Sequence, residues 1–145
     1  PEYSGNGLVM LEPTYKHILL EDIGEWGSIV LDDGLFLACD TALTKKVVAR
    51  SNLSSAALGK EGLFNLSLSG NGVAVLESPV ARDELVEINL QNDEVKIDGN
   101  MAIAWSASLQ FTVEMSSKSI LGSAVSGEGL VNVYRGTGRI LVALT

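Results

Sequence analysis

The sequence predicts an all-β fold, and three observations support this prediction. Strand-like segments recur along the 145-residue chain, short turn signals separate them, and helical spacing is rare. Closely spaced strands of this kind are typical of a β-sandwich or a barrel. With 46% hydrophobic residues, a chain of this length can fill a core without a metal or disulfide. We therefore expect residues 1–145 to form a single all-β domain.

Two of the predicted strands, within 63–70 and 94–99, alternate apolar and polar residues. The other predicted strands are nearly continuous apolar runs, which are typical of strands covered on both faces. These runs lie within 7–13, 28–40, 72–79, 100–115 and 138–145. Two stretches, 43–60 and 116–125, are ambiguous, and each is compatible with a short helix or a 3₁₀ turn.

An internal repeat of about 66 residues organises the chain. The phrase "SGNG" occurs at 4–7 and again at 69–72, and "RGTG" takes its place at 135–138. Between these points the turns and strands recur in the same order, with offsets of 65 to 67 residues. The alignment predicts repeat 1 over 5–69, repeat 2 over 70–135 and a closing strand over 136–145. We expect the two units to close a common core with pseudo-two-fold symmetry, as in a double-stranded β-helix or sandwich.

The glycine-rich phrase itself has two interpretations, a phosphate-binding loop or a turn. A dinucleotide-binding glycine loop follows a strand and opens a helix, whose N-terminus receives the phosphate. In this chain each Gly-x-Gly is followed by another apolar strand. Because Asn-Gly is a preferred two-residue connection, the sequence favours hairpin turns.

Several blocks resemble one known family. They are "GNGLVMLEPTY", "DDGLFLACDTAL", "GKEGLFNLSLSGNGVAVLES" and "GEGLVNVYRGTGRILVAL", which together cover nearly the whole chain. They are similar to the family named for altered inheritance of mitochondria, member twenty-four, which has many bacterial members. The resemblance implies an all-β fold similar to that of the tryptophan RNA-binding attenuation protein, and it does not imply a catalytic activity. Family members usually have further strands before the position of Pro1, so we expect either that an N-terminal segment is missing or that the chain is a shorter relative.

Charge and cysteine content exclude some classes of function. The formal net charge of −8 disfavours nucleic acids and anionic membranes as partners. Membrane association enters only by analogy, since a mitochondrial family member is linked to inner-membrane organisation. One cysteine permits no internal disulfide, which fits a reducing compartment. We expect a bacterial cytoplasmic protein, or a mitochondrial one if the source is eukaryotic.

Cys39 and His17 are the first candidates for catalysis. A catalytic cysteine needs a base, and His17 is the only histidine. However, Cys39 alternates with apolar strand residues, and its counterpart in the second repeat is Trp105. We therefore interpret Cys39 as a packed thiol and His17 as a residue at a turn or strand start. A single histidine also makes a cupin-type metal enzyme a poor alternative.

Acidic and basic clusters are the remaining polar candidates. The pairs Asp32–Asp33 and Asp83–Glu84 could hold a hard cation, but no spaced calcium-loop pattern surrounds them. We interpret both pairs as turn or surface residues. RNA binding rests on fold analogy alone, and the basic stretch 45–50 contains no aromatic residue for stacking. The sequence thus predicts no catalytic, metal or cofactor site, and no nucleic-acid partner.

Two matched loops, Ser51–Gly59 and Ser116–Gly127, mix Ser and Gly with apolar residues. They could form lids over the core or, if exposed, a surface for self-association. The sequence favours a non-enzymatic structural or interaction module that forms a homo-oligomer. The alternative is a module that binds a small molecule between its sheets.

Overall fold

A computed structural model describes residues 1–12, 14–49, 64–115 and 130–145. Nearly all regular structure in these ranges is β, so the all-β prediction is confirmed. The strands are β1 (His17–Asp22), β2 (Ser28–Leu31), β3 (Phe36–Cys39), β4 (Thr44–Ala49), β5 (Phe64–Ser69), β6 (Val73–Ser78), β7 (Val86–Asp98), β8 (Ala102–Ser106), β9 (Gln110–Met115) and β10 (Leu130–Val142). Two short helices, α1 (Ile23–Trp26) and η1 (Arg82–Glu84), accompany these strands.

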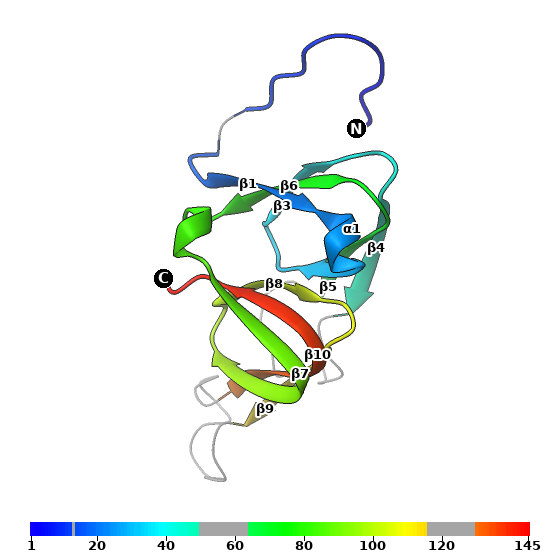
Figure 1. Ribbon diagram of the computed structural model, residues 1–145. Coiled ribbons are helices and arrows are strands. Elements are labelled where there is room, and N and C mark those ends of the chain that lie inside the picture. Colours follow the sequence, from blue (N-terminus) through cyan, green and yellow to red (C-terminus); the bar gives the residue numbers. More distant parts are fainter. Residues whose placement is uncertain (13, 50–63, 116–129) are drawn as a thin grey trace.

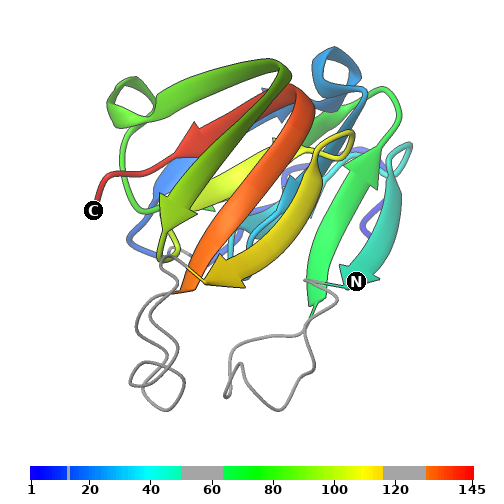
Figure 2. The same cartoon turned by 90° about the horizontal axis from the view of Figure 1, so that it is seen from below.

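The strands pair antiparallel in two sheets (Figures 1 and 2). The smaller sheet has the order β1-β6-β3. The larger sheet has the order β4-β5-β2-β8-β10-β7, and β9 pairs with β10 beside this path. The smaller sheet lies at one end of the molecule, and β9 lies at the opposite end (Figure 1).

Two hydrophobic cores lie on opposite sides of the β2–β8 pair. The first core lies between the two sheets and includes Leu31 and Ala104, which are register partners. The second core lies within the larger sheet, which curves back on itself, and it includes the partners Val30 and Trp105. Because successive residues of a strand point to opposite faces, β2 and β8 form a wall that contributes to both cores.

The predicted hairpin at the second "SGNG" phrase is wrong. Strands β5 and β6 flank it but do not pair with each other, since β5 pairs with β2 and β4 while β6 pairs with β1 and β3. The phrase is a corner at which the chain passes between sheets, and Gly70 adopts a φ of 107° there. At the third phrase, β10 continues through Gly136 and Gly138 with a bulge, so strand 136–145 does not begin there.

The N-terminal segment also differs from expectation. Residues 7–12 carry a strand-like sequence, but residues 1–12 contain no strand in the structure and extend from the molecule as an arm (Figure 1). A strand needs a neighbour for its backbone hydrogen bonds, and the described part of the chain supplies none here.

The two stretches that were ambiguous between helix and strand are only partly described by the structure. Residues 44–49, in the first ambiguous stretch, form β4, while 50–60 and 116–125 lie outside the described residues. The sequence analysis did not predict α1. This single turn begins where the Asp22 carboxylate accepts a hydrogen bond from the Gly24 amide at 2.9 Å, and it buries Ile23 and Trp26.

Candidate functional site

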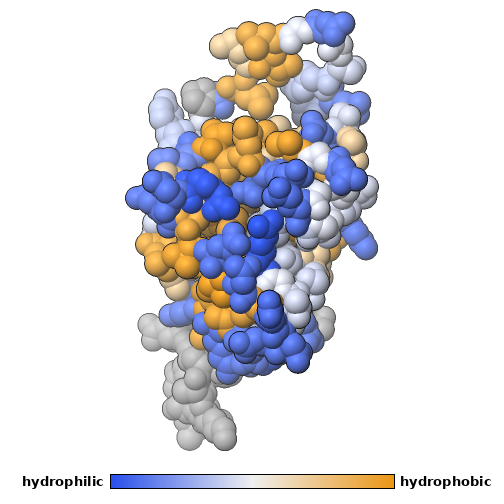
Figure 3. All heavy atoms as spheres, viewed as in Figure 1, coloured by the Kyte–Doolittle hydropathy of each residue, from blue (hydrophilic) through white to orange (hydrophobic). Residues whose placement is uncertain are grey.

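The most distinctive surface is the side of the smaller sheet that faces away from the first core. We define this outer face by Ile18, Leu20, Leu37, Val73 and Val75. Ile18, Leu20 and Val73 are 52%, 71% and 41% exposed, and the other two are partly buried. Figure 3 shows hydrophobic atoms gathered over this end of the molecule.

Strand alternation explains why this sheet is apolar on both sides. Leu19 on β1 and Ala74 and Leu76 on β6 point into the first core and are at most 3% exposed. Their neighbours Leu20 and Val75, which are register partners, point the other way. A sheet face of this composition is typical of a surface that another protein covers.

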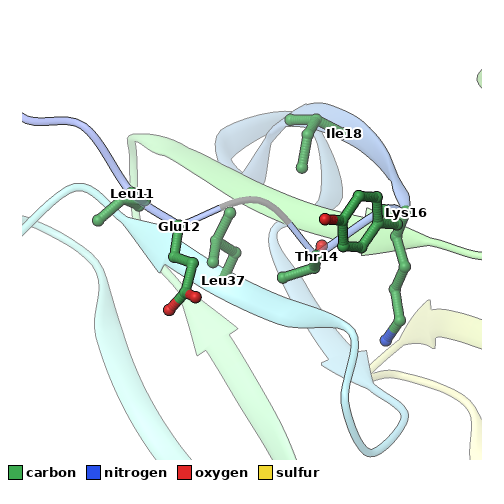
Figure 4. Close-up of a pocket in the computed structure, with 7 residues that line it drawn as sticks. Leu11, Glu12, Thr14, Lys16, Ile18 and Leu37 are labelled. Carbon is green, nitrogen blue, oxygen red and sulfur yellow. The ribbon is translucent and has the colours of Figure 1, made fainter.

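A groove runs along one side of the outer face, where the arm meets the sheet (Figure 4). Its volume is about 360 Å³, and it is open to solvent. It is lined by Leu11, Glu12, Thr14, Tyr15, Lys16, Ile18 and Leu37. The Lys16 ammonium lies 3.8 Å from the Glu77 carboxylate and donates a 3.4 Å hydrogen bond to the Gly34 carbonyl. The groove therefore joins an apolar surface to a small polar rim.

Cys39 and His17 do not meet in the structure. Cys39 is on β3, is partly buried and packs against the first core, which agrees with the packed-thiol interpretation. His17 is the exposed first residue of β1. Along β6 their register partners are Ala74 and Ser78, so the two residues are separated by four residues of strand, or about 13 Å, in addition to the strand spacing.

The two acidic pairs lie in turns and short surface elements. Asp33 and Gly34 form a turn closed by a 3.3 Å hydrogen bond from the Leu35 amide to the Asp32 carbonyl. Asp83 and Glu84 belong to η1, where the Glu84 carboxylate accepts a hydrogen bond from the Ala81 amide. No group of three or more His, Cys, Asp or Glu that could hold a metal occurs among the described residues.

Other predicted features have different outcomes. Lys45 and Lys46 are exposed on β4, and the Lys45 ammonium lies 3.9 Å from the Cys39 sulfur. Arg50 and both Ser-rich loops lie outside the described residues. The interior between the sheets, where a small ligand was the alternative expectation, is filled by the side chains of the first core.

A charged cluster occupies the opposite end of the molecule, on β7, β9 and β10. We call it the charged end and define it by Glu94, Lys96, Glu114 and Arg135. The Arg135 guanidinium contacts the carboxylates of Glu94 and Glu114, in the second case at 2.7 Å. It also donates a 3.0 Å hydrogen bond to the Thr112 hydroxyl. Each partner thus has its charge compensated by a neighbour.

This geometry shifts two pKa values. The hydrogen bond from Arg135 holds the pKa of Glu114 below its ordinary value of 4.5, against a smaller opposing effect of burial. The hydrogen bond to Glu114 raises the pKa of Arg135 in turn.

Acidification is therefore expected to remove stabilisation at the charged end. Because the pKa of Glu114 is lower in the folded state, the unfolded state binds this proton first as pH falls. The contribution is complete above pH 4.5 and is lost as pH falls through the lowered value. Urea unfolding at a series of pH values should show this loss in the natural chain and not in Glu114→Gln. Parallel curves for the two proteins would contradict the assignment.

The sequence profile of the family described as mitochondrial biogenesis AIM24 matches residues 1–143, which is almost the entire chain. The chain belongs to the AIM24 family. The family resemblance drawn from the repeated blocks is thus confirmed.

Two comparisons extend this result. An uncharacterized protein of Streptococcus pyogenes serotype M6 is 31% identical to this AIM24 chain over 140 residues, which make up 95% of the chain and 54% of that protein. An X-ray crystal structure of a Streptococcus pyogenes protein is similar with a TM-score of 0.67 and 29% identity, covering 89% of this chain and 54% of the other. The chain therefore spans about half the length of each relative.

Within the described residues of this AIM24 chain, no helix has both the length and the apolar character needed to cross a membrane.

The sequence analysis missed the outer face as a candidate site. Its signal was the nearly continuous apolar run in 72–79, which was interpreted as a strand covered on both sides.

Proposed function

We propose that this AIM24 chain is a structural or protein-interaction module that has no catalytic activity of its own and associates with itself through the outer face. The observation that carries the proposal is the apolar outer face, on which Leu20 is 71% exposed. Monomeric proteins rarely expose contiguous apolar surface of this kind unless it binds something. We place its work in the bacterial cytoplasm, and its similarity to a streptococcal protein supports the bacterial part of this assignment.

The proposal includes an architecture of two tandem repeats, which together make a double-stranded β-helix. Its main support is strand register, because pairs in the first unit recur 66 residues later in the second. The matched pairs are Ser28↔Ser69 and Glu94↔Arg135, Thr44↔Ser69 and Gln110↔Arg135, and Cys39↔Ala74 and Trp105↔Ile140. Chance similarity of sequence would not preserve register in three separate strand pairs.

Close contacts at two equivalent glycines, Gly72 and Gly138, support the same architecture. A side chain at Gly72 would approach Asp40 and Leu43, and one at Gly138 would approach their equivalents Ser106 and Leu109. A hydrogen bond recurs as well: the Val73 amide donates to Asp40 at 2.7 Å, and the Arg139 amide donates to Ser106 at 3.0 Å. A Cβ would thus be crowded by equivalent neighbours at the Gly72 corner and at the Gly138 bulge.

The repeat relation also explains why the outer face is exposed: no described unit of the chain covers it. Leu37, Ala38 and Val75 on the smaller sheet have as equivalents Ile103, Ala104 and Leu141 in the second unit. Those equivalents are at most 6% exposed, because the first unit covers them within the first core. The units then follow one another in a stack, in contrast to the expected pseudo-two-fold relation. The same surface is therefore covered in one unit and open in the other.

Leu20→Glu tests the proposal. We expect light scattering to show an oligomer for the natural chain at high micromolar concentration. For the variant, we expect the association affinity to fall by about tenfold or more. The reason is that each copy would bring a carboxylate into an apolar contact. Val47→Glu is the matched control, because Val47 is 66% exposed on β4 and lies outside the outer face. A monomeric natural chain, or equal weakening by both substitutions, would refute the proposal.

A further inference from the structure

The two ends of the molecule differ in chemistry although their strands are equivalent. Val30 on β2 and Val48 on β4 pack against the second core. Their equivalents 66 residues later are Lys96 on β7 and Glu114 on β9, which belong to the charged end. The positions that contact a following unit in the first repeat therefore carry charges in the second.

The replacement of apolar residues by charged ones in the second repeat is similar to what is found in the terminal caps of repeat proteins. Terminal units of such proteins carry a polar outer surface, which ends the stack. At the charged end, Arg135 bridges two carboxylates and Lys96 lies 3.8 Å from Glu94. If the apolar outer face of a second copy covered this cluster, four charged groups would lose water, and desolvation of such groups is costly. Head-to-tail stacking of copies is thereby disfavoured.

We propose that two copies associate head to head, with their outer faces packed against each other about a two-fold axis. This inference rests on the proposed self-association and adds the partner surface and the symmetry. The outer face carries exposed apolar side chains on β1 and β6, with Asp22 and Glu77 near its ends, so the outer face of a second copy offers it a matching apolar surface. A two-fold contact of one patch with itself is the commonest form of homo-oligomer and closes without leaving a free outer face.

The packing would resemble an ordinary β-sandwich. Two sheets in face-to-face contact lie about 10 Å apart, and their side chains interdigitate. On this surface Val75 is central, because its register partners are Leu20 on β1 and Ala38 on β3. The axis would therefore pass close to Val75, and the Val75 side chains of the two copies would meet. The charged ends would point away from each other into water.

Site-specific oxidation tests this arrangement. The only natural cysteine, Cys39, is first changed to Ser, and Val75→Cys is then introduced. We expect mild oxidation to give a disulfide-linked dimer of this variant at micromolar concentration. Leu20→Cys in the same background is a second probe in case the Val75 variant folds poorly. Lys96→Cys at the charged end is the matched control, and we expect it to remain uncrosslinked.

Each other outcome overturns a defined part of the inference. A disulfide between mixed Val75→Cys and Lys96→Cys chains, without the Val75 homodimer, would establish head-to-tail contact in place of head-to-head contact. A Lys96 homodimer would show that the charged ends meet. An oligomer by light scattering that crosslinks at neither Val75 nor Leu20 would overturn the geometry and leave the proposed self-association standing. A monomer at high micromolar concentration would overturn both.

Discussion

Trp105→Ala is expected to lower the free energy of unfolding by about 3–5 kcal/mol. Trp105 is 4% exposed in the second core, where its ring lies 5.5 Å from Phe111 and 5.2 Å from Tyr134 between centroids. Truncation would leave a cavity and would remove both ring contacts, which stabilise beyond the area they bury. Urea unfolding followed by circular dichroism would measure the change.

Tyr3→Ala is the control for this prediction. Tyr3 is also aromatic, but it lies on the arm and is 62% exposed. We expect its removal to change the free energy of unfolding by less than about 0.5 kcal/mol. A loss below about 1 kcal/mol for Trp105→Ala would mean that the second core is not packed as described.

Leu76→Ala is expected to destabilise the protein by about 2–5 kcal/mol. Leu76 is fully buried in the first core, on the inner side of the smaller sheet. The neighbouring strands hold its surroundings in place, so the site cannot collapse fully around the smaller side chain. Thermal and urea unfolding would both report the loss.

Leu20→Ala provides the comparison on the other side of the same sheet. The same methyl groups are removed there, but Leu20 is exposed in the single chain. At a concentration where the protein is monomeric, we expect a change within about 0.5 kcal/mol. Equal losses at Leu76 and Leu20 would contradict the assignment of inner and outer sides to this sheet.

Local sequence signals predicted the strands better than their pairing. The turn at Asp33 and Gly34 and the strands around it follow from apolar runs and turn residues. The corner at Gly70 could not be recognised, because Asn-Gly is compatible with a hairpin and only the distant partners of β5 and β6 decide against one. The strand predicted within 7–13 is absent from residues 7–12 for a related reason, since strand propensity without a partner strand gives an extended arm.

The candidate site was less predictable than the fold. An apolar run indicates that both sides of a strand lack polar residues. It does not indicate whether each side is covered by the chain's own core or by another protein. In this chain Leu76 is covered by the first core and Val75 belongs to the outer face, although both are ordinary strand residues. The charged end was hidden in the same way, because Glu94, Glu114 and Arg135 come together only through the pairing of three strands.

The 13-residue strand β10 has a consequence for how the protein folds during synthesis. It pairs with β7, β8 and β9, and of the described strands it leaves the ribosome last. Val142 on β10 pairs with Val86 on β7, so this contact forms only after the more than fifty residues between them have been made. Until then the apolar residues of β8 have no complete core, which is the condition under which nascent chains aggregate. The second core can therefore be completed only after β10, the last of the described strands in the sequence, has been made.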